Sequence, residues 1–171
     1  MIECGAMAER QSGTGAARSA TSDTAELATT QDTLALGARL GAELRAGDVV
    51  VLSGPLGAGK TLLAKGIAAA MDVEGPVISP TFVLARVHRA RRAGAPAMVH
   101  VDMYRLLDHA SVDLLSELDS LDLDTDLDDA VVVVEWGEGL AERLSENHLD
   151  IRLERGWDTE VRTATWQWSR P

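Results

Sequence analysis

The chain has 171 residues, of which 46% are hydrophobic, and its formal net charge is −11 at pH 7. This length suits one globular domain, and no apolar run approaches the roughly 20 residues of a membrane-spanning helix. The acidic charge disfavours a stand-alone nucleic-acid binder, and a single cysteine, Cys4, excludes an intrachain disulfide and a cysteine metal cluster. Because the N-terminal segment also lacks an apolar signal core, we expect a cytoplasmic protein.

The first 23 residues differ in composition from the rest of the chain. They are rich in Ala, Gly, Ser and Thr and show no hydrophobic periodicity. Such a segment cannot bury enough apolar surface to offset the entropy cost of ordering it. We therefore predict a disordered tail over residues 1–23 and one folded domain over residues 24–171.

The first elements of the domain predict the start of a parallel α/β sheet. Leucines at helical spacing indicate a helix over 30–45, with Thr30 or Asp32 as its N-cap. The apolar run 48–53 predicts a buried strand, and residues 61–71 are strong helix formers. A strand, a glycine-rich turn and a helix in this order are typical of a parallel sheet.

The later elements predict the rest of one sheet. They are a β-rich segment over 77–87, a basic turn over 89–96, a strand over 97–103, a helix over 111–118, an acidic loop over 121–129, a strand over 131–136, a helix over 138–144, and hairpin strands over 149–154 and 160–168. Within the hairpin, we expect Arg152 and Arg162 to face solvent. The predicted fold class is α/β, with a mostly parallel central sheet flanked by helices and a C-terminal β-hairpin.

A phosphate-binding motif joins the first predicted strand to the next helix. The sequence GPLGAGKT over residues 54–61 fits the pattern G-x-x-x-x-G-K-[ST] without a mismatch. Glycines let backbone N–H groups point at phosphate oxygens, and the following helix directs its positive end at the same anion. We expect Lys60 to reach the β- and γ-phosphates and the Thr61 hydroxyl to bind Mg²⁺. The alternative is an ordinary glycine-rich turn.

This motif predicts a single-domain P-loop NTPase that binds ATP or GTP together with Mg²⁺. The residues expected to bind the nucleotide through the motif are Gly54, Leu56, Gly57, Ala58, Gly59, Lys60, Thr61 and Leu62.

Two carboxylates stand at the ends of apolar strands. Asp102 ends one strand, and Glu135 follows a run of four valines that resembles a Walker B strand with Glu in place of Asp. Ligands of open parallel sheets bind at the carboxyl ends of strands, so we expect both side chains near Mg²⁺ and the γ-phosphate. One carboxylate would orient Mg²⁺ and the other would position or activate the attacking water. Helix caps or loop salt bridges are the alternative roles.

Three further residues carry weaker indications. Thr81, in the segment Ser79-Pro-Thr-Phe, could offer its hydroxyl to the γ-phosphate, although an edge-strand proline beside a buried Phe explains the segment equally well. Trp136 could stack on a base or contact a partner, or it could pack in the core. His100 shares a strand face with Asp102 and is interpreted first as a structural histidine.

The ordered motifs GPLGAGKT, SPTF, HVDMYRL and VVVVEWGE resemble the TsaE family of bacterial ATPases in tRNA threonylcarbamoyladenosine biosynthesis. The likeness covers about residues 25–168. The first motif occurs in many NTPases, whereas the ordered set of the other three is much more specific. The resemblance implies that Glu135 is the metal-site acid and Asp102 a catalytic carboxylate. It also places Trp136 beside the site and Thr81 in the segment that covers the phosphates.

The resemblance implies a weak ATPase required for the threonylcarbamoyladenosine (t6A) modification of the tRNA adenosine beside the anticodon. The implied partner is a heterodimer of the threonylcarbamoyl transferase subunit and its inactive paralogue, and tRNA is reached only through that complex. Hydrolysis of ATP would reset the complex between rounds. The preference for ATP over GTP also rests on this resemblance, and no membrane is implied.

One position departs from the family pattern, and two other function classes stay open. Pro55 stands where the family usually has Asp; proline removes one N–H, so the cradle should survive without any contribution from the Asp side chain. A small-molecule kinase on a P-loop fold would need an acceptor pocket and usually an arginine-bearing lid. A nucleotide-binding regulatory subunit would not hydrolyse ATP, and the two strand-end carboxylates argue against it.

Overall fold

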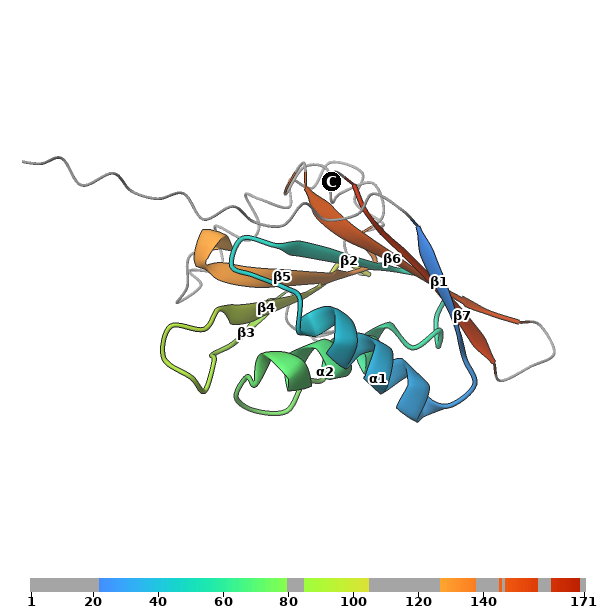
Figure 1. Ribbon diagram of the computed structural model, residues 1–171, viewed down its shortest axis with the longest axis horizontal. Helices are drawn as coiled ribbons and strands as arrows, with labels where there is room; N and C mark the ends of the chain where they lie inside the picture. The colour runs from blue at the N-terminus through green and yellow to red at the C-terminus, as the bar shows by residue number, and fades with distance from the viewer. Residues whose placement is uncertain are drawn as a thin grey trace, which may run out of the picture.

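Seven strands form one mixed sheet in this computed structural model, which describes residues 22–79, 85–104, 127–137, 145, 147–156 and 161–169. The strand order is β1-β7-β6-β2-β5-β4-β3 (Figure 1). The strands are β1 (Asp23–Leu27), β2 (Val49–Ser53), β3 (Ala85–His88), β4 (Ala97–Asp102), β5 (Ala130–Glu135), β6 (His148–Arg155) and β7 (Arg162–Trp168). The helices are α1 (Thr30–Gly41), α2 (Lys60–Met71) and the short 3₁₀ helix η1 (Leu127–Asp129).

The four central strands, β6, β2, β5 and β4, run parallel, and the three flanking pairings are antiparallel. This arrangement confirms the predicted α/β class with a parallel centre, and β6 and β7 form the predicted C-terminal hairpin. The carboxyl ends of parallel strands meet at one edge of a sheet. The loop after β2 and the last residues of β4 and β5 therefore lie together.

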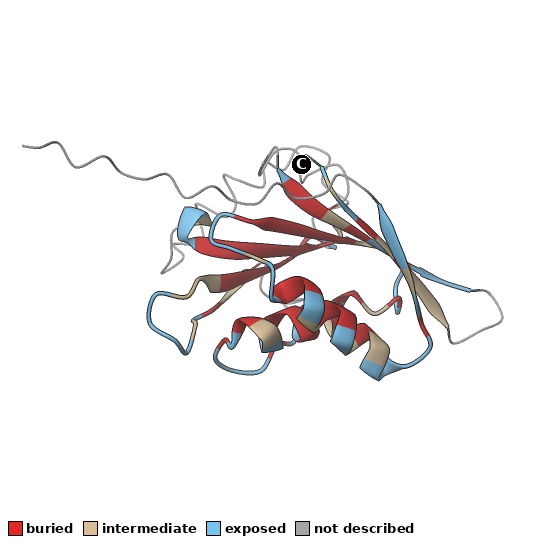
Figure 2. Ribbon diagram, in the orientation of Figure 1, coloured by how far each residue is buried: buried red, intermediate tan, exposed pale blue. Residues whose placement is uncertain are grey.

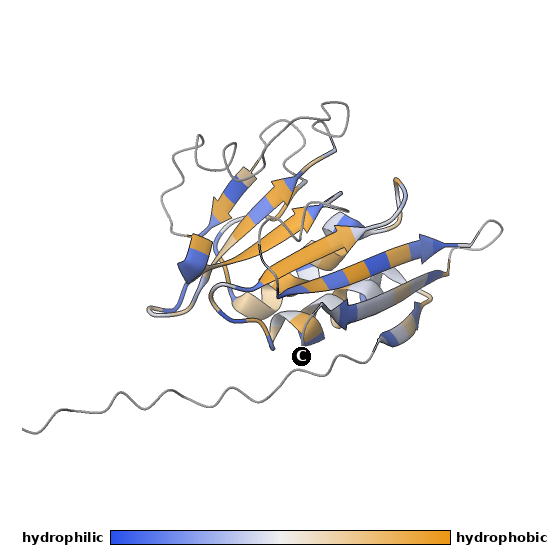
Figure 3. Cartoon of the chain, turned by 90° about the horizontal axis from the view of Figure 1, so that it is seen from above, coloured by the Kyte–Doolittle hydropathy of each residue, from blue (hydrophilic) through white to orange (hydrophobic). Residues whose placement is uncertain are grey.

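The valine-rich central strands are buried on both faces, as is typical of parallel sheets. Val50 packs in a core cluster with residues of α1 and α2, whereas its neighbours Val49 and Val51 belong to a second cluster on the opposite face. Figure 3 shows the valine strands β2 and β5 as nearly continuous hydrophobic runs. The two helices lie side by side on one face, with their buried sides toward the sheet (Figure 2).

Glycines allow α1 and α2 to approach each other closely. A Cβ atom on Gly37 would lie 2.4 Å from the carbonyl oxygen of Leu63, and one on Gly66 would lie 2.4 Å from that of Leu34. Neither position has room for a side chain, so the two backbones are in direct contact. This contact holds the first half of α2, and with it the end of the phosphate loop, against α1.

The ends of α1 differ from the prediction. Thr29 is the N-cap, one residue before the earlier of the two predicted caps, while Asp32 completes a capping box by accepting from the Thr29 N–H at 2.8 Å. The helix ends at Gly41 rather than at residue 45. The reason is that the Asp48 carboxylate accepts from the Arg45 N–H at 2.7 Å and holds the connection to β2 as a turn.

β1 has no counterpart among the predicted elements, and it begins at Asp23, inside the predicted tail. Only Leu27 of this strand is buried, so the sequence carries little strand pattern. The strand forms because its backbone pairs antiparallel with β7. The remainder of the predicted tail, residues 1–21, lies outside the described residues.

Several predicted segments also fall outside the described residues. They are the helices 111–118 and 138–144, the part of the acidic loop before η1, and residues 80–84 of the β-rich segment. In that segment β3 covers only Ala85–His88. Across the described residues, no helix has the length and apolar character needed to span a membrane.

Candidate functional site

The loop between β2 and α2 has the backbone of a phosphate cradle. Gly54, Gly57 and Gly59 have φ angles of 133°, 77° and 107°, which disfavour residues with a side chain. At Gly54 a Cβ atom would also lie 2.1 Å from the Leu153 carbonyl oxygen. Gly59 is the N-cap of α2 and supplies no side-chain cap, so the N–H groups of the first helical turn are available to an anion.

Lys60 is held inside this loop. Its side chain is buried, and its Nζ donates to the carbonyl oxygens of Gly54 at 2.7 Å and Pro55 at 3.0 Å. The same Nζ lies 3.5 Å from the centre of the Trp136 ring, in a cation–π contact. The ammonium is therefore held at the cradle by two loop carbonyls and one aromatic face.

A hydrogen-bonded chain joins the start of α2 to the centre of the sheet. The Thr61 hydroxyl donates to Glu135 Oε2 at 2.9 Å, and His100 Nε2 lies 2.9 Å from Glu135 Oε1. Glu135 and His100 are both buried, and they come from the neighbouring parallel strands β5 and β4. The two oxygens of one carboxylate are thus each occupied, one by the loop and one by the sheet.

Asp102 is the second carboxylate of the site. It ends β4 directly opposite Glu135 in the strand register, as expected for two strand-end acids. The Ser79 hydroxyl donates to Asp102 Oδ2 at 2.6 Å, and the Tyr104 N–H donates to Oδ1 at 3.0 Å. These two bonds fix the orientation of the carboxylate beside the cradle.

Trp136 follows β5 in a left-handed conformation, with φ of 62°. A non-glycine residue in this region is uncommon and costs of order 1–3 kcal/mol where the surroundings impose it. Its ring lies 5.1 Å from that of Tyr104, tilted by 53°, and also covers Lys60. This backbone conformation therefore places an aromatic side chain against Lys60 and Tyr104 at the site, while the side chain also packs against the second core cluster.

Most of the predicted site residues line one cavity of about 490 Å³. The lining residues are Leu56, Gly57, Gly59, Lys60, Thr61, Leu62, Ser79, Asp102, Tyr104, Glu135 and Trp136. Two predicted residues are absent from the lining: Gly54 packs against β6, and Ala58 is buried in the core. Thr81 lies outside the described residues, so its predicted role stays a prediction.

The cavity includes two residues that were not among the predicted site residues, Ser79 and Tyr104. Ser79 and Tyr104 both lie inside the motifs SPTF and HVDMYRL, so their positions carried a signal. Arg162 does not line the cavity but lies beside the loop. It was expected to face solvent and is instead partly buried, with its Nε buried and 3.6 Å from the position of a Cβ on Gly59. The sequence of β7 does not indicate this contact, because the contact depends on β7 lying beside β6, which in turn pairs with β2. Arg152, by contrast, is exposed as expected.

The oxygen donors of this site suit a magnesium ion. Mg²⁺ is usually held by one or two carboxylates together with phosphate oxygens and water, rather than by a cage of protein ligands. Thr61 and Glu135 offer one hydroxyl and one carboxylate at the cradle. No group of three His, Cys, Asp or Glu side chains able to hold a metal occurs among the described residues, so a zinc-type centre has no support there.

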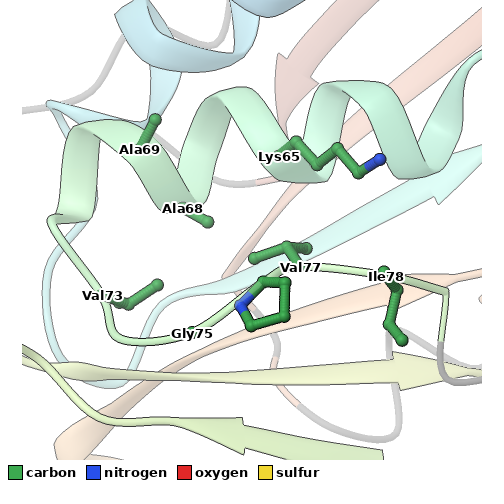
Figure 4. Close-up of a pocket in the computed structure, with 8 residues that line it drawn as sticks. Lys65, Ala68, Ala69, Val73, Gly75, Val77 and Ile78 are labelled. Atoms are coloured by element: carbon green, nitrogen blue, oxygen red, sulfur yellow. The ribbon is translucent and has the colours of Figure 1, made fainter.

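An apolar groove of about 400 Å³ lies beside the cavity, between α2 and the following loop (Figure 4). It is lined by Lys65, Ala68, Ala69, Val73, Gly75, Pro76, Val77 and Ile78. Lys65 is the single charged residue of this lining. The groups able to bind phosphate or a metal therefore belong to the neighbouring cavity.

Comparison with known proteins gives a consistent set of relatives. Residues 27–163 match the family described as "Threonylcarbamoyl adenosine biosynthesis protein TsaE". The chain is 77% identical over 147 residues to the "tRNA threonylcarbamoyladenosine biosynthesis protein TsaE" of Mycobacterium tuberculosis H37Rv, covering 86% of this chain and 88% of that protein. The protein of the same name from Streptomyces coelicolor is 53% identical over 133 residues, covering 76% and 86%.

A solved structure agrees with these sequence relatives. The crystal structure of YdiB from Bacillus subtilis superposes with a TM-score of 0.64 at 25% identity, covering 85% of this chain and 84% of that chain. The fold and the order of motifs therefore point to the same group of proteins.

Proposed function

Because this chain belongs to the TsaE family of threonylcarbamoyl adenosine biosynthesis proteins, we propose that it binds and hydrolyses ATP in the t6A modification of tRNA. In this proposal it is an accessory protein, weakly active alone, that acts on the transferase complex and does not transfer the threonylcarbamoyl group itself. The names of the relatives support the pathway, and the geometry of the cavity supports the chemistry.

The observation that carries the proposal is the 2.9 Å contact between Thr61 and Glu135. A hydroxyl that follows the P-loop lysine, beside a carboxylate from a neighbouring parallel strand, is the pair that holds Mg²⁺ in P-loop NTPases. The two residues are 74 positions apart in the chain, so this pairing depends on the fold. An ordinary glycine-rich turn would not require it.

Lys60 would bind the β- and γ-phosphates of ATP. It now donates to two loop carbonyls and contacts the face of Trp136, all of which are neutral. Phosphate oxygens carry full negative charge, whereas the carbonyls carry only partial charge, so the ammonium would exchange the carbonyls for phosphate oxygens. The Trp136 ring, which now lies over the Lys60 ammonium, would then lie beside the bound phosphates.

The two carboxylates would divide the remaining work. Thr61 and Glu135 would hold Mg²⁺, which when bound neutralises the charge that develops on the phosphoryl group. Asp102 would orient the attacking water, since both of its oxygens are already fixed by Ser79 and by the Tyr104 N–H. This division follows from the proximity of Glu135, rather than Asp102, to the P-loop hydroxyl.

The proposed partner is the heterodimer of the transferase subunit and its inactive paralogue, with tRNA contacted through that complex. Three large hydrophobic side chains are exposed on or beside the cavity: Leu56 at 81%, Ile78 at 49% and Tyr104 at 49%. Exposed apolar groups that gather at a site favour a protein surface that covers it. The acidic net charge of −11 agrees with contact to tRNA through a partner rather than directly.

The proposal is tested by measuring t6A in tRNA from cells depleted of this protein and supplied with wild type or Lys60→Ala. We expect the modification to fall on depletion and to return only with wild type, because the variant lacks the phosphate-binding ammonium. Unchanged t6A on depletion would overturn the role in this pathway. A phosphorylated small-molecule product would then favour the kinase alternative, and rescue by Lys60→Ala would show that nucleotide turnover is dispensable.

A further inference from the structure

His100 lies directly beneath the site and is completely buried on β4. Its neighbours Val99 and Val101 face the opposite side of the sheet, so its ring points toward α2, as do Met98 and Asp102. The ring contacts Glu135 through Nε2 at 2.9 Å. A buried histidine needs a hydrogen-bond partner, and His100 has it in the carboxylate that also contacts Thr61.

The hydrogen-bond pattern fixes the donor in this contact. Glu135 already accepts from the Thr61 hydroxyl through Oε2, and a carboxylate can only accept, so His100 Nε2 carries the proton and donates to Oε1. His100 Nδ1 is buried and has no hydrogen-bond partner among the described residues. All the hydrogen bonding of this ring that the described residues show is therefore directed at one oxygen of Glu135.

We infer that His100 is a positioning residue that holds Glu135 Oε1, so that Oε2 stays at the Thr61 hydroxyl, where Mg²⁺ would be bound. The inference rests on the proposed function and adds a group that no motif assignment gave this role. Glu is one methylene longer than the Asp usual in such sites. The longer side chain has an additional rotatable bond, so its carboxylate needs a second anchor to keep one oxygen at the loop.

The surroundings of His100 keep its ring in this orientation. His88, on the neighbouring strand β3, lies 6.5 Å away between ring centres, and its own Nδ1 lies 3.2 Å from the Glu74 carbonyl oxygen. His88 is also buried, at 3% exposure. With a second fixed ring beside it and the sheet beneath, the imidazole of His100 acts as a rigid support rather than a mobile one.

The test compares three substitutions of His100 that keep or remove the donor at the Nε2 position. In His100→Gln the amide nitrogen can occupy the Nε2 position. In His100→Asn the side chain is too short for its nitrogen to reach that position, and in His100→Leu the side chain has no donor. Met98→Leu changes a buried side chain on the same face of the same strand and is the matched control. For each protein, calorimetry gives the affinity for ADP over a range of Mg²⁺ concentrations, and thermal unfolding without nucleotide gives the stability.

Outer-shell changes typically cost about 10- to 100-fold in metal affinity. We expect His100→Asn and His100→Leu to raise the half-saturating Mg²⁺ concentration by about this factor, while His100→Gln and Met98→Leu stay within about threefold of wild type. Binding of ADP without Mg²⁺ should change little in any variant. This difference between the Gln and Asn variants is one that a purely structural role would not produce.

The inference is overturned if Gln and Asn show the same Mg²⁺ dependence, if Leu matches wild type, or if the Gln variant fails to fold. Should the Leu variant alone unfold, the Gln and Asn pair decides the question. Absence of Mg²⁺-dependent ADP binding by the wild type would instead overturn the proposed function, which separates the two failures.

Discussion

Single residues of this site form direct hydrogen bonds with partners in other elements. Thr61 lies in the first turn of α2, whereas its acceptor Glu135 ends β5, and Ser79 and Asp102 form a similar pair at 2.6 Å. Each contact joins a loop or helix terminus to a strand end. Loss of one polar group should therefore change ligand affinity more than it changes the fold, because the surrounding backbone is fixed by the sheet.

Replacing Thr61 with Val removes the hydroxyl and keeps the shape of the side chain. We expect Thr61→Val to weaken Mg²⁺-dependent binding of ADP by about tenfold, which corresponds to about 1.4 kcal/mol. Thr61→Ser keeps the hydroxyl and should bind within a few-fold of wild type. Calorimetric titration with and without Mg²⁺ measures both variants, and a Val variant with unchanged Mg²⁺ dependence would contradict the metal role of Thr61.

At the scale of elements, the position of the phosphate loop depends on how α2 packs. The helix begins at the last glycine of the loop, and its inner face packs against both the sheet and α1. Close contact between the two helices at Gly37 and Gly66 leaves no tolerance for an added methyl group.

Gly37→Ala should destabilise the protein although alanine is the better helix former. The new Cβ would lie 2.4 Å from the Leu63 oxygen and 2.9 Å from Gly66 Cα, both backbone atoms, so the helices must separate. Overpacking of this kind costs about 1–3 kcal/mol, more than the roughly 1 kcal/mol gained in propensity. Urea unfolding measures the change, and Ala35→Gly on the exposed side of α1 calibrates the propensity. A more stable Gly37→Ala protein would contradict the close contact.

The free energy of unfolding should also decrease as the pH is lowered, because of His88. Burial lowers the pKa of His88 below its ordinary value of 6.5, against the opposing effect of the hydrogen bond to the Glu74 carbonyl, and nearby His100 and Arg86 lower it further. The unfolded chain therefore takes up this proton first, so the stabilisation is complete above about pH 6.5 and is lost as the pH falls below it. His88→Asn removes this titration and keeps a donor near the position of Nδ1.

The measurement is urea unfolding of wild type and His88→Asn at several pH values between about 7.5 and 5. We expect the free energy of unfolding of wild type to fall more steeply toward acid than that of the variant. Parallel curves for the two proteins would show that His88 keeps its ordinary pKa in the folded state.

At the scale of the whole molecule, the strand order decides which residues meet. β2 lies between β5 and β6, and β4 lies beyond β5, so the loop after β2 faces the ends of two strands from later in the chain. β6 runs parallel to β2 and β7 returns antiparallel beside it, so β7 starts at the edge where β2 ends and Arg162 lies beside Gly59. β1 pairs with the outer side of β7 and completes the sheet at that edge.

A pair of N-terminal truncations tests where the folded domain begins. Removing residues 1–21 should leave thermal stability and ADP binding unchanged if these residues form the predicted tail. Removing residues 1–28 also deletes β1 and exposes the edge of β7. Leu27 is only 2% exposed, and loss of such a side chain alone costs about 1.5–3 kcal/mol, so we expect a clear fall in the unfolding midpoint. Equal stability of the two truncated proteins would show that β1 adds nothing to the domain.

Features that depend only on neighbouring residues could be predicted from the amino-acid sequence. The phosphate loop is eight consecutive positions, 54–61, because a cradle of backbone N–H groups and a helix terminus is a local structure. The valine runs of β2 and β5 and the hairpin of β6 and β7 are equally local patterns, and the structure confirms them. Asp102 and Glu135 were expected at one edge because parallel strands end together, and they lie opposite each other in register.

Which of these groups are in contact depends on the three-dimensional fold. Thr61, Glu135 and His100 come from α2, β5 and β4, and no spacing along the chain specifies that they form one hydrogen-bonded chain. β1 forms although its sequence is weakly patterned, because the free edge of β7 supplies its partners. Arg162 lies beside the loop and is partly buried for the same reason. The surroundings of a side chain depend on what the fold packs against its strand, and local periodicity does not specify that.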